Sequence, residues 1–93
     1  MKSYASIDRI EGEYAVCEVE LVDTINSKVL SAKYKETRMV DFSMNAITNC
    51  IGNIKEGDII VVEQNDGIIL VIYGKDEEEK QRRIDLLKSI MKK

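Results

Sequence analysis

The sequence contains no histidine and no proline, and it has only two cysteines. Without histidine the chain lacks the usual general base near neutral pH, the Ser-His and Cys-His nucleophile pairs and nearly every familiar zinc site. Cys17 and Cys50 are too few and too far apart in the sequence for a metal-binding cluster. The sequence therefore predicts no metal site, no cofactor and no histidine-dependent catalysis.

Long apolar runs are also absent. The longest run is far short of the roughly 20 residues that a membrane-spanning helix needs. Lys2 lies near the start of the chain, but Asp8 and Arg9 interrupt the segment that would be apolar in a signal peptide. We therefore expect no membrane association and a cytoplasmic location.

Charged residues are plentiful but unevenly placed. The 93 residues are 44% hydrophobic and 33% charged, which is typical of one soluble globular domain. Residues 1–74 contain 7 basic and 12 acidic side chains, a balance of −5, whereas residues 75–93 contain 7 basic and 5 acidic ones, a balance of +2. The acidic body disfavours a nucleic-acid groove, whose affinity depends on lysine and arginine.

The most regular apolar stretches are residues 59–62 and 68–73, which are rich in β-branched side chains. Between them Asp66 and Gly67 predict the two-residue type I′ turn of a β-hairpin, because both residues can adopt positive φ angles. Both faces of this hairpin are apolar, whereas a solvated antiparallel strand would alternate with polar residues. We therefore expect the hairpin to lie in the centre of the sheet, with a cover on each face.

The two-residue loop also predicts how the hairpin strands pair. Val62 would lie opposite Val71, and Ile60 would lie opposite Tyr73. Successive side chains would then alternate between the two faces of the sheet.

Alternation of apolar and polar residues predicts further strands at residues 4–10, 14–22, 28–34 and 37–44. The last two are either separate strands or one long bent strand, and the sequence fits both. Cys17 shares the apolar face of its strand, whereas Cys50 could be partly exposed. We expect a buried or inert thiol at both positions.

Between the strands the two-residue period breaks at residues 45–53, where apolar residues recur at helical spacing. Ser43 or Asn45 can cap such a helix, and Gly52 can end it. One or two helical turns are expected here.

A longer helix is predicted at the C-terminus. Asp76 can cap its first turn with Glu79 three residues on. Pairs of Glu78 with Arg82 and of Glu79 with Arg83 would support it at i,i+4 spacing. The helix is amphipathic, and its apolar stripe consists of Ile84, Leu86, Leu87, Ile90 and Met91.

An amphipathic helix must cover apolar surface somewhere. We expect this one to dock on a face of the central hairpin, either in its own subunit or in a partner. Protein partnership and self-association are thus both open, and the candidate interaction surface is Ile84, Leu87, Ile90 and Met91.

Together these patterns predict a mainly β protein. Residues 1–74 would form a small antiparallel sheet of about five strands, either a barrel of the OB or SH3 type or a barrel-like sheet. Residues 75–93 would form the amphipathic helix, packed on the sheet or on a partner.

Small barrels of this type often bind nucleic acid. Here the only basic residues interleaved with an aromatic residue are Lys33, Lys35 and Arg38, beside Tyr34. Such a cluster is more often a solvated strand face. Nucleic-acid binding is therefore the alternative hypothesis rather than the leading one.

Three carboxylates lie close together in the sequence, at Asp8, Glu11 and Glu13. Paired carboxylates can act as acid and base or hold magnesium. Acidic turns are ordinary, however, and nothing in the sequence distinguishes one of these groups. We expect no catalytic residue, and we assign Arg9 to structural charge pairing.

Two motifs and the charged C-terminal helix resemble those of a small bacterial family, domain of unknown function 3006. The motifs are the Lys-Glu-Gly-Asp element at residues 55–58 and Ile7-Asp8-Arg9-Ile10-Glu11-Gly12-Glu13-Tyr14-Ala15-Val16. The overlap spans nearly the whole chain. Residues 23–38 are longer than the connection usual in that family, and the proline often found before the Glu-Gly-Asp element is missing.

The resemblance implies a small bacterial barrel-like protein, sometimes encoded beside or fused to hydrolases of the metallo-β-lactamase fold. It implies no catalytic residue. The function expected from the sequence is therefore a non-catalytic protein-interaction or accessory module, associated with such a hydrolase if the resemblance holds.

Overall fold

The computed structural model describes residues 1–21 and 36–91 of the chain. The elements in these residues are β1 Lys2–Glu11, β2 Tyr14–Glu20, β3 Thr37–Ser43, α1 Met44–Ile51, β4 Ile59–Asn65, β5 Ile68–Lys75 and α2 Glu77–Met91. Each helix and strand expected within the described residues is confirmed to within a few residues. The strand expected at residues 28–34, and with it the choice between one bent strand and two, lies outside them.

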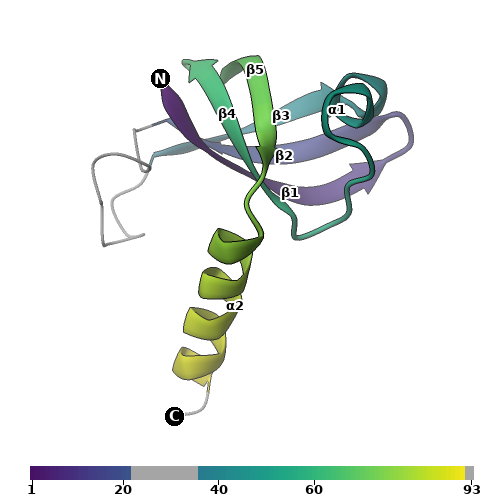
Figure 1. Ribbon diagram of the computed structural model, residues 1–93. Helices are drawn as coiled ribbons and strands as arrows, with labels where there is room; N and C mark the ends of the chain where they lie inside the picture. Colours follow the sequence, from purple (N-terminus) through teal and green to yellow (C-terminus); the bar gives the residue numbers. More distant parts are fainter. Residues whose placement is uncertain (22–35, 92–93) are drawn as a thin grey trace.

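The five strands form one antiparallel sheet in the order β3-β2-β1-β4-β5. β1 belongs to both halves, because residues 5–11 pair with β2 and residues 2–6 pair with β4. A bulge between Ile7 and Arg9 shifts the register in the first of these pairings. β4 and β5 cross the β1-β2-β3 layer steeply (Figure 1). This order, with α1 between β3 and β4, is that of an OB-type barrel opened between β3 and β5.

The opening between β3 and β5 is called the seam here, because these two strands are not neighbours in the sheet. Two features bridge it. α1 follows directly from the end of β3 and packs against both strands. At the other end of β3, Arg38 donates from Nη1 to the carbonyl oxygen of Asp66 at 2.7 Å. The described sheet is therefore barrel-like, and its circumference is completed by a helix and a side chain.

The turn between β4 and β5 is the predicted type I′ turn. Asp66 has φ 53° and Gly67 has φ 86°, the two positive angles that this turn requires. The buried Gln64 side chain fixes the turn, because its Oε1 accepts from the Gly67 N–H at 2.9 Å. Its Nε2 donates to the carbonyl oxygen of Glu20 at 3.2 Å, which ties the hairpin to β2.

The predicted pairing of the hairpin strands is wrong. Val62 lies opposite Ile72, and Ile60 lies opposite Lys75. Two irregularities in the ladder leave one additional β5 residue each, Leu70 and Tyr73, without a partner in β4. Such bulges insert a residue into one strand only, so an expectation of strict alternation misses them.

The prediction of a central hairpin is also wrong for one of its strands. β4 lies inside the sheet, but β5 is an edge strand. The apolar side chains of β5 are therefore largely exposed. One of them, Tyr73, is contacted by Lys2, whose Nζ lies 4.6 Å from the centroid of the Tyr73 ring. The exposed apolar residues of β5 are Ile68, Leu70, Val71 and Tyr73. The two strands share an apolar pattern on both faces but differ in burial. Most apolar side chains of β4 are buried, whereas most of those of β5 are exposed.

The core lies on the inner face of the curved sheet, beneath α1. Its fully buried members are Ala5, Ile7, Ala15, Cys17, Val19, Ile47, Ile60 and Val62. The expectation for Cys17 is confirmed, and burial raises the pKa of its thiol to about 11. The thiol of Cys50 was expected to be either buried or inert. Cys50 is exposed, so the expectation of burial is wrong.

α1 is held between the caps that the sequence predicts. Ser43 Oγ accepts from the Ala46 N–H at 3.4 Å, and Gly52, with φ 81°, donates its N–H to the carbonyl oxygen of Thr48 at 2.9 Å. Ile47 is the side chain that α1 buries in the core. Neither α1 nor α2, over the residues described, is long and apolar enough to cross a bilayer.

Replacement of Ile60 by alanine should lower the free energy of unfolding by about 2–5 kcal/mol, because this side chain is fully buried. Ile68, which is 66% exposed at the end of the same hairpin, provides the matched control. Its replacement should change that free energy by less than about 0.5 kcal/mol. Urea denaturation of both variants measures the difference, and equal losses would contradict the observed burial pattern.

The two cysteines should also react differently with a thiol reagent such as Ellman's reagent. One thiol per chain, that of Cys50, should react rapidly under native conditions, and two should react in denaturant. The variant Cys50→Ser should remove the rapid reaction. Rapid reaction of two thiols in the native protein would contradict the burial of Cys17.

Candidate functional site

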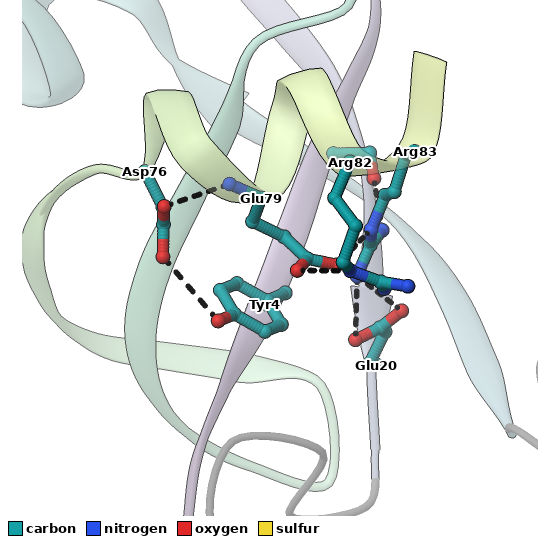
Figure 2. A network of polar contacts seen from close by, with 7 residues as sticks. Tyr4, Glu20, Asp76, Glu79, Arg82 and Arg83 are labelled. Atoms are coloured by element: carbon teal, nitrogen blue, oxygen red, sulfur yellow. Dashed lines mark hydrogen bonds and ion pairs between the residues drawn. The ribbon is translucent and has the colours of Figure 1, made fainter. Parts of the chain in front are cut away.

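The start of α2 is fixed by β1 and β4. Asp76 is its cap, because Oδ1 accepts from the Glu79 N–H at 2.9 Å. The other carboxylate oxygen of Asp76 accepts from the Tyr4 hydroxyl of β1 at 3.3 Å (Figure 2). The Asp76 N–H in turn donates to the carbonyl oxygen of Ile59 in β4 at 2.8 Å. The helix therefore leaves the sheet in a defined direction.

The Lys-Glu-Gly-Asp element at residues 55–58 forms a turn that binds the second turn of α2. Gly57 has φ 89°, which makes the turn possible, and Asp58 Oδ2 accepts from the Lys55 N–H at 2.9 Å. Asp58 Oδ1 accepts from Lys80 Nζ of α2 at 2.8 Å, and Lys75 Nζ lies 3.8 Å from Oδ2. The motif that marked the family resemblance thus anchors the helix.

The Asp58 carboxylate is only 2% exposed, yet it is ionised by its surroundings. Burial acts to raise its pKa, but the hydrogen bonds from Lys80 and from the Lys55 N–H outweigh burial, and the pKa lies below its usual value. A buried carboxylate with these donors is satisfied as an anion. It has no proton to give at neutral pH.

Arg83 holds the next turn of α2 against the sheet. Its Nη2 lies 3.2 Å from Oε2 of Glu20, a buried residue of β2, and its Nη1 donates to Ser6 Oγ at 3.4 Å. The guanidinium also lies 5.2 Å from the centroid of the Tyr4 ring (Figure 2). Together the residues that hold α2 are called the clamp here, and they are Tyr4, Glu20, Asp58, Asp76, Glu79, Lys80 and Arg83.

Glu79 pairs with two arginines, Arg83 on the side of α2 that faces the sheet and Arg82 on the outer side. The expected pair of Glu79 with Arg83 is confirmed at 2.6 Å. Arg82, which was expected to pair with Glu78, instead donates to both oxygens of Glu79, at 2.6 and 2.8 Å. The hydrogen bond from Arg82 is the largest of the effects that lower the pKa of Glu79 to about 2. Each clamp carboxylate is therefore engaged structurally.

Beyond the clamp, α2 projects away from the sheet (Figure 1). No residue of α2 is buried, and the exposed fraction rises from 37% at Ile84 to 76% at Met91. Two places were expected for this stripe, the hairpin of its own subunit or a partner. The first is wrong, because only the first turns of α2 contact the sheet, and the second stays a prediction. The exposed stripe is called the distal face, and it consists of Ile84, Leu86, Leu87, Ile90 and Met91.

The distal face continues the side of α2 that the clamp holds. Successive helical residues turn by about 100°, so Leu87 and Ile90 follow Lys80 and Arg83 along one side of the helix. All four residues of the predicted interaction surface are on the distal face, and Leu86 widens it. The same side of one helix is therefore charged where it meets the sheet and apolar where it leaves it.

A second apolar surface, which the sequence did not predict, lies at the seam. It is a groove of about 240 Å³ lined by Phe42, Ala46, Cys50, Ile69, Leu70, Val71 and Ile72. The groove exists because α1 and the bulged edge strand β5 meet without a hydrogen-bonded ladder. Local periodicity contains no signal for it, since the lining comes from three elements.

The outer face of β2 and β3 is the surface on which OB-type barrels bind nucleic acid. In this protein it presents the exposed carboxylates Glu18 and Asp41, while the buried Glu20 carboxylate is bound by Arg83 of α2. These two strands add no lysine or arginine to the face. Arg38 is directed to the inner rim, where it binds Asp66. The other three residues of the basic cluster, Lys33, Tyr34 and Lys35, lie outside the described residues.

Two of the three carboxylates singled out near the first turn, Asp8 and Glu11, pair with Arg9. Asp8 Oδ2 lies 2.8 Å from Arg9 Nη1, and Glu11 Oε1 lies 2.5 Å from Arg9 Nε. The three side chains are about half exposed, so this is a solvent-screened surface cluster. Within residues 1–21 and 36–91 no three histidine, cysteine or carboxylate side chains are grouped to hold a metal ion.

Comparison with known proteins adds no relative. No protein-family model matches the chain, and no curated protein or solved structure is significantly similar to it. The resemblance to domain of unknown function 3006 therefore stays a prediction from the sequence.

The clamp should lose stability in acid. The pKa of Glu79 is lowered from 4.5 to about 2 by folding, so the stabilisation is present above the unfolded value and is lost as pH falls from about 4.5 towards about 2. At neutral pH, Glu79→Gln should cost about 1 kcal/mol, after allowance for the solvent around Arg82. It should also flatten the acid side of a plot of melting temperature against pH.

Glu78→Gln is the matched control, since Glu78 is an exposed neighbour in the same helical turn. It should leave both the melting temperature and its dependence on pH nearly unchanged. An acid side as steep in Glu79→Gln as in the parent protein would show that Glu79 is not part of the clamp in solution.

Proposed function

We propose that this chain is a non-catalytic protein-interaction module, and that its contact element is the distal face of α2. The observation that carries the proposal is the exposure of five apolar side chains on one side of a helix whose base is fixed to the sheet. Exposed apolar patches of this kind are typical of interaction sites. Helices recognised in grooves use anchors at the same i, i+3, i+4 and i+7 spacing.

The order of residues along α2 supports the same conclusion. A helix that serves only to cover its own sheet places apolar side chains against the sheet and charged ones in solvent. In α2 the order is reversed, because Lys80 and Arg83 meet the sheet and Leu87 and Ile90 meet solvent. The clamp positions the helix, and the distal face remains available to another molecule.

The clamp also reduces the cost of binding. An isolated helix of this length is marginal in water, and ordering it on binding would consume part of the interaction energy. Here the cap at Asp76 and the ion pairs of Lys80 and Arg83 order the first half of the helix before any partner arrives. The distal face is therefore presented in a preformed conformation.

A photo-crosslinking amino acid at position 87, introduced into the full chain in its natural host, tests the proposal. Leu87 lies on the distal face, and Ser89 lies on the opposite side of the same turn, so position 89 is the matched control. Irradiation should give a defined adduct from position 87 and none from position 89. Mass spectrometry of the adduct identifies the partner and shows whether it is a hydrolase, as the family resemblance implies.

Absence of a specific adduct from position 87, in a protein whose melting temperature is unchanged, would contradict the proposed function. The variant with Leu87→Ser and Ile90→Ser supplies a further check. Both side chains are more than half exposed, so their replacement should leave the melting temperature of the monomer nearly unchanged while it removes the interaction.

A further inference from the structure

We infer that the open edge of β5 binds an extended, uncharged peptide segment. The segment pairs with β5 as an additional strand and places alternate side chains in the groove at the seam. This site is separate from the distal face of α2, so the inference does not rest on the proposed function. Three observations support it: the direction of the free main-chain groups of β5, the absence of charge along this strand, and the course of the groove.

The pairing of β4 determines which main-chain groups of β5 face the open edge. The Gln64 N–H donates to the carbonyl oxygen of Met1 at 2.9 Å, and the Gln64 carbonyl oxygen accepts from the Met1 amino group at 2.8 Å. The main chain of Gln64 therefore faces β1, and by alternation so does that of Val62. Their partners in β5 are Ile69 and Ile72. The N–H and C=O groups of these two residues consequently point away from β4, towards the seam.

The charge of β5 indicates what can pair with it. Edge strands are usually protected from further pairing by charged side chains, proline, bulges or a covering element. β5 has two bulges, and α1 packs beside it, but residues 68–74 contain no charged residue and no proline. The lining of the groove is uncharged as well. A charged side chain buried there would lose its water without a compensating partner, so the segment that matches this site in charge is an uncharged one.

The groove lies where an added strand would place its side chains. Four consecutive residues of β5, 69–72, form one of its walls. Because successive side chains of a strand point to opposite faces, a wall of four consecutive residues runs along the edge of the strand, where the free main-chain groups are. The volume of about 240 Å³ is below the roughly 300–1,000 Å³ of small-molecule pockets. It suits a few side chains of an extended chain.

Addition of a strand to a sheet edge is a general mode of peptide recognition. Main-chain hydrogen bonds supply the affinity, and pockets for alternate side chains supply the specificity. In this protein Ile69 and Ile72 provide the main-chain groups, and Phe42, Ala46 and the bulged residue Leu70 form part of the pocket. The edge of β5 therefore combines both requirements in one place.

Cys50 provides a direct measure of occupancy, because it lines the groove and is exposed. The probe comes from selection of a random library of short displayed peptides against the immobilised full chain. We expect enriched sequences in which uncharged apolar residues recur at every second position. A synthetic peptide of the most enriched sequence should slow the reaction of Cys50 with Ellman's reagent, and the buried thiol of Cys17 does not interfere.

N-methylation of the selected peptide tests whether it pairs as a strand. Alternate N–H groups of an added strand donate to β5, and the others point away from it. Two analogues are compared, one with N-methyl groups at the odd-numbered residues and one with them at the even-numbered residues. One analogue should protect Cys50 at least about tenfold more weakly than the parent peptide, because two or more hydrogen bonds are lost. The other should bind within about threefold of the parent peptide.

A charge placed in the groove tests the site from the side of the protein. Leu70→Lys should weaken peptide binding about tenfold, because Leu70 lines the groove. Ile68→Lys is the matched control, since Ile68 belongs to the same strand, is similarly exposed at 66% against 62%, and does not line the groove. It should change the affinity by less than about twofold. Both variants should keep the melting temperature of the parent protein nearly unchanged.

Selection that enriches no peptide would overturn the inference, and so would equal effects of the two methylated analogues or unweakened binding by Leu70→Lys. A selected peptide that leaves Cys50 fully reactive binds elsewhere and would also overturn it. Protection of Cys50 that rises with protein concentration in the absence of peptide would assign the groove to a second copy instead. The variant with Leu87→Ser and Ile90→Ser should bind the peptide as the parent does, which separates this test from that of the proposed function.

Discussion

The buried carboxylate of Asp58 joins three parts of the molecule that would otherwise be independent. The Asp58 side chain closes the turn at residues 55–58 and binds Lys80 of α2. The main-chain carbonyl oxygen of Asp58 accepts from the Ile7 N–H of β1 at 2.8 Å. A buried charge is stabilising only when its partners replace the lost water. Because Lys80, Lys75 and a backbone N–H do so here, the direction of α2 is set by the fold of the sheet.

This arrangement separates the attachment of the helix from its apolar surface. Polar contacts depend on orientation, so the clamp fixes both the angle and the rotation of α2 about its axis. Apolar contacts tolerate sliding, and an α2 attached by leucines alone would be less well oriented. The use of Arg83, Glu20 and Tyr4 for attachment leaves the apolar side chains free of any internal role, which is why their exposure is informative about function.

The sequence predicts local features of this fold well and long-range features poorly. Positive φ at Asp66 and Gly67, the cap at Asp76 and the burial of Cys17 each depend on a few neighbouring residues, and each is confirmed. The bulges at Leu70 and Tyr73 and the edge position of β5 depend on which strands meet, and periodicity contains no such information. The apolar stripe of α2 was predicted, but its exposure follows from where the clamp residues lie in the sheet.

The open seam has a consequence for how this barrel can vary in sequence. In a closed barrel the number of strands and their stagger fix the girth, so a change of volume inside must be absorbed by every ladder. Here α1 and the Arg38 side chain complete the circumference, and neither imposes a hydrogen-bond register between β3 and β5. Larger or smaller side chains at Ala46 or Phe42 can widen or narrow the barrel while all four strand pairings stay intact. Amino-acid differences among proteins descended from this chain should therefore be most frequent at residues that line the seam between β3 and β5.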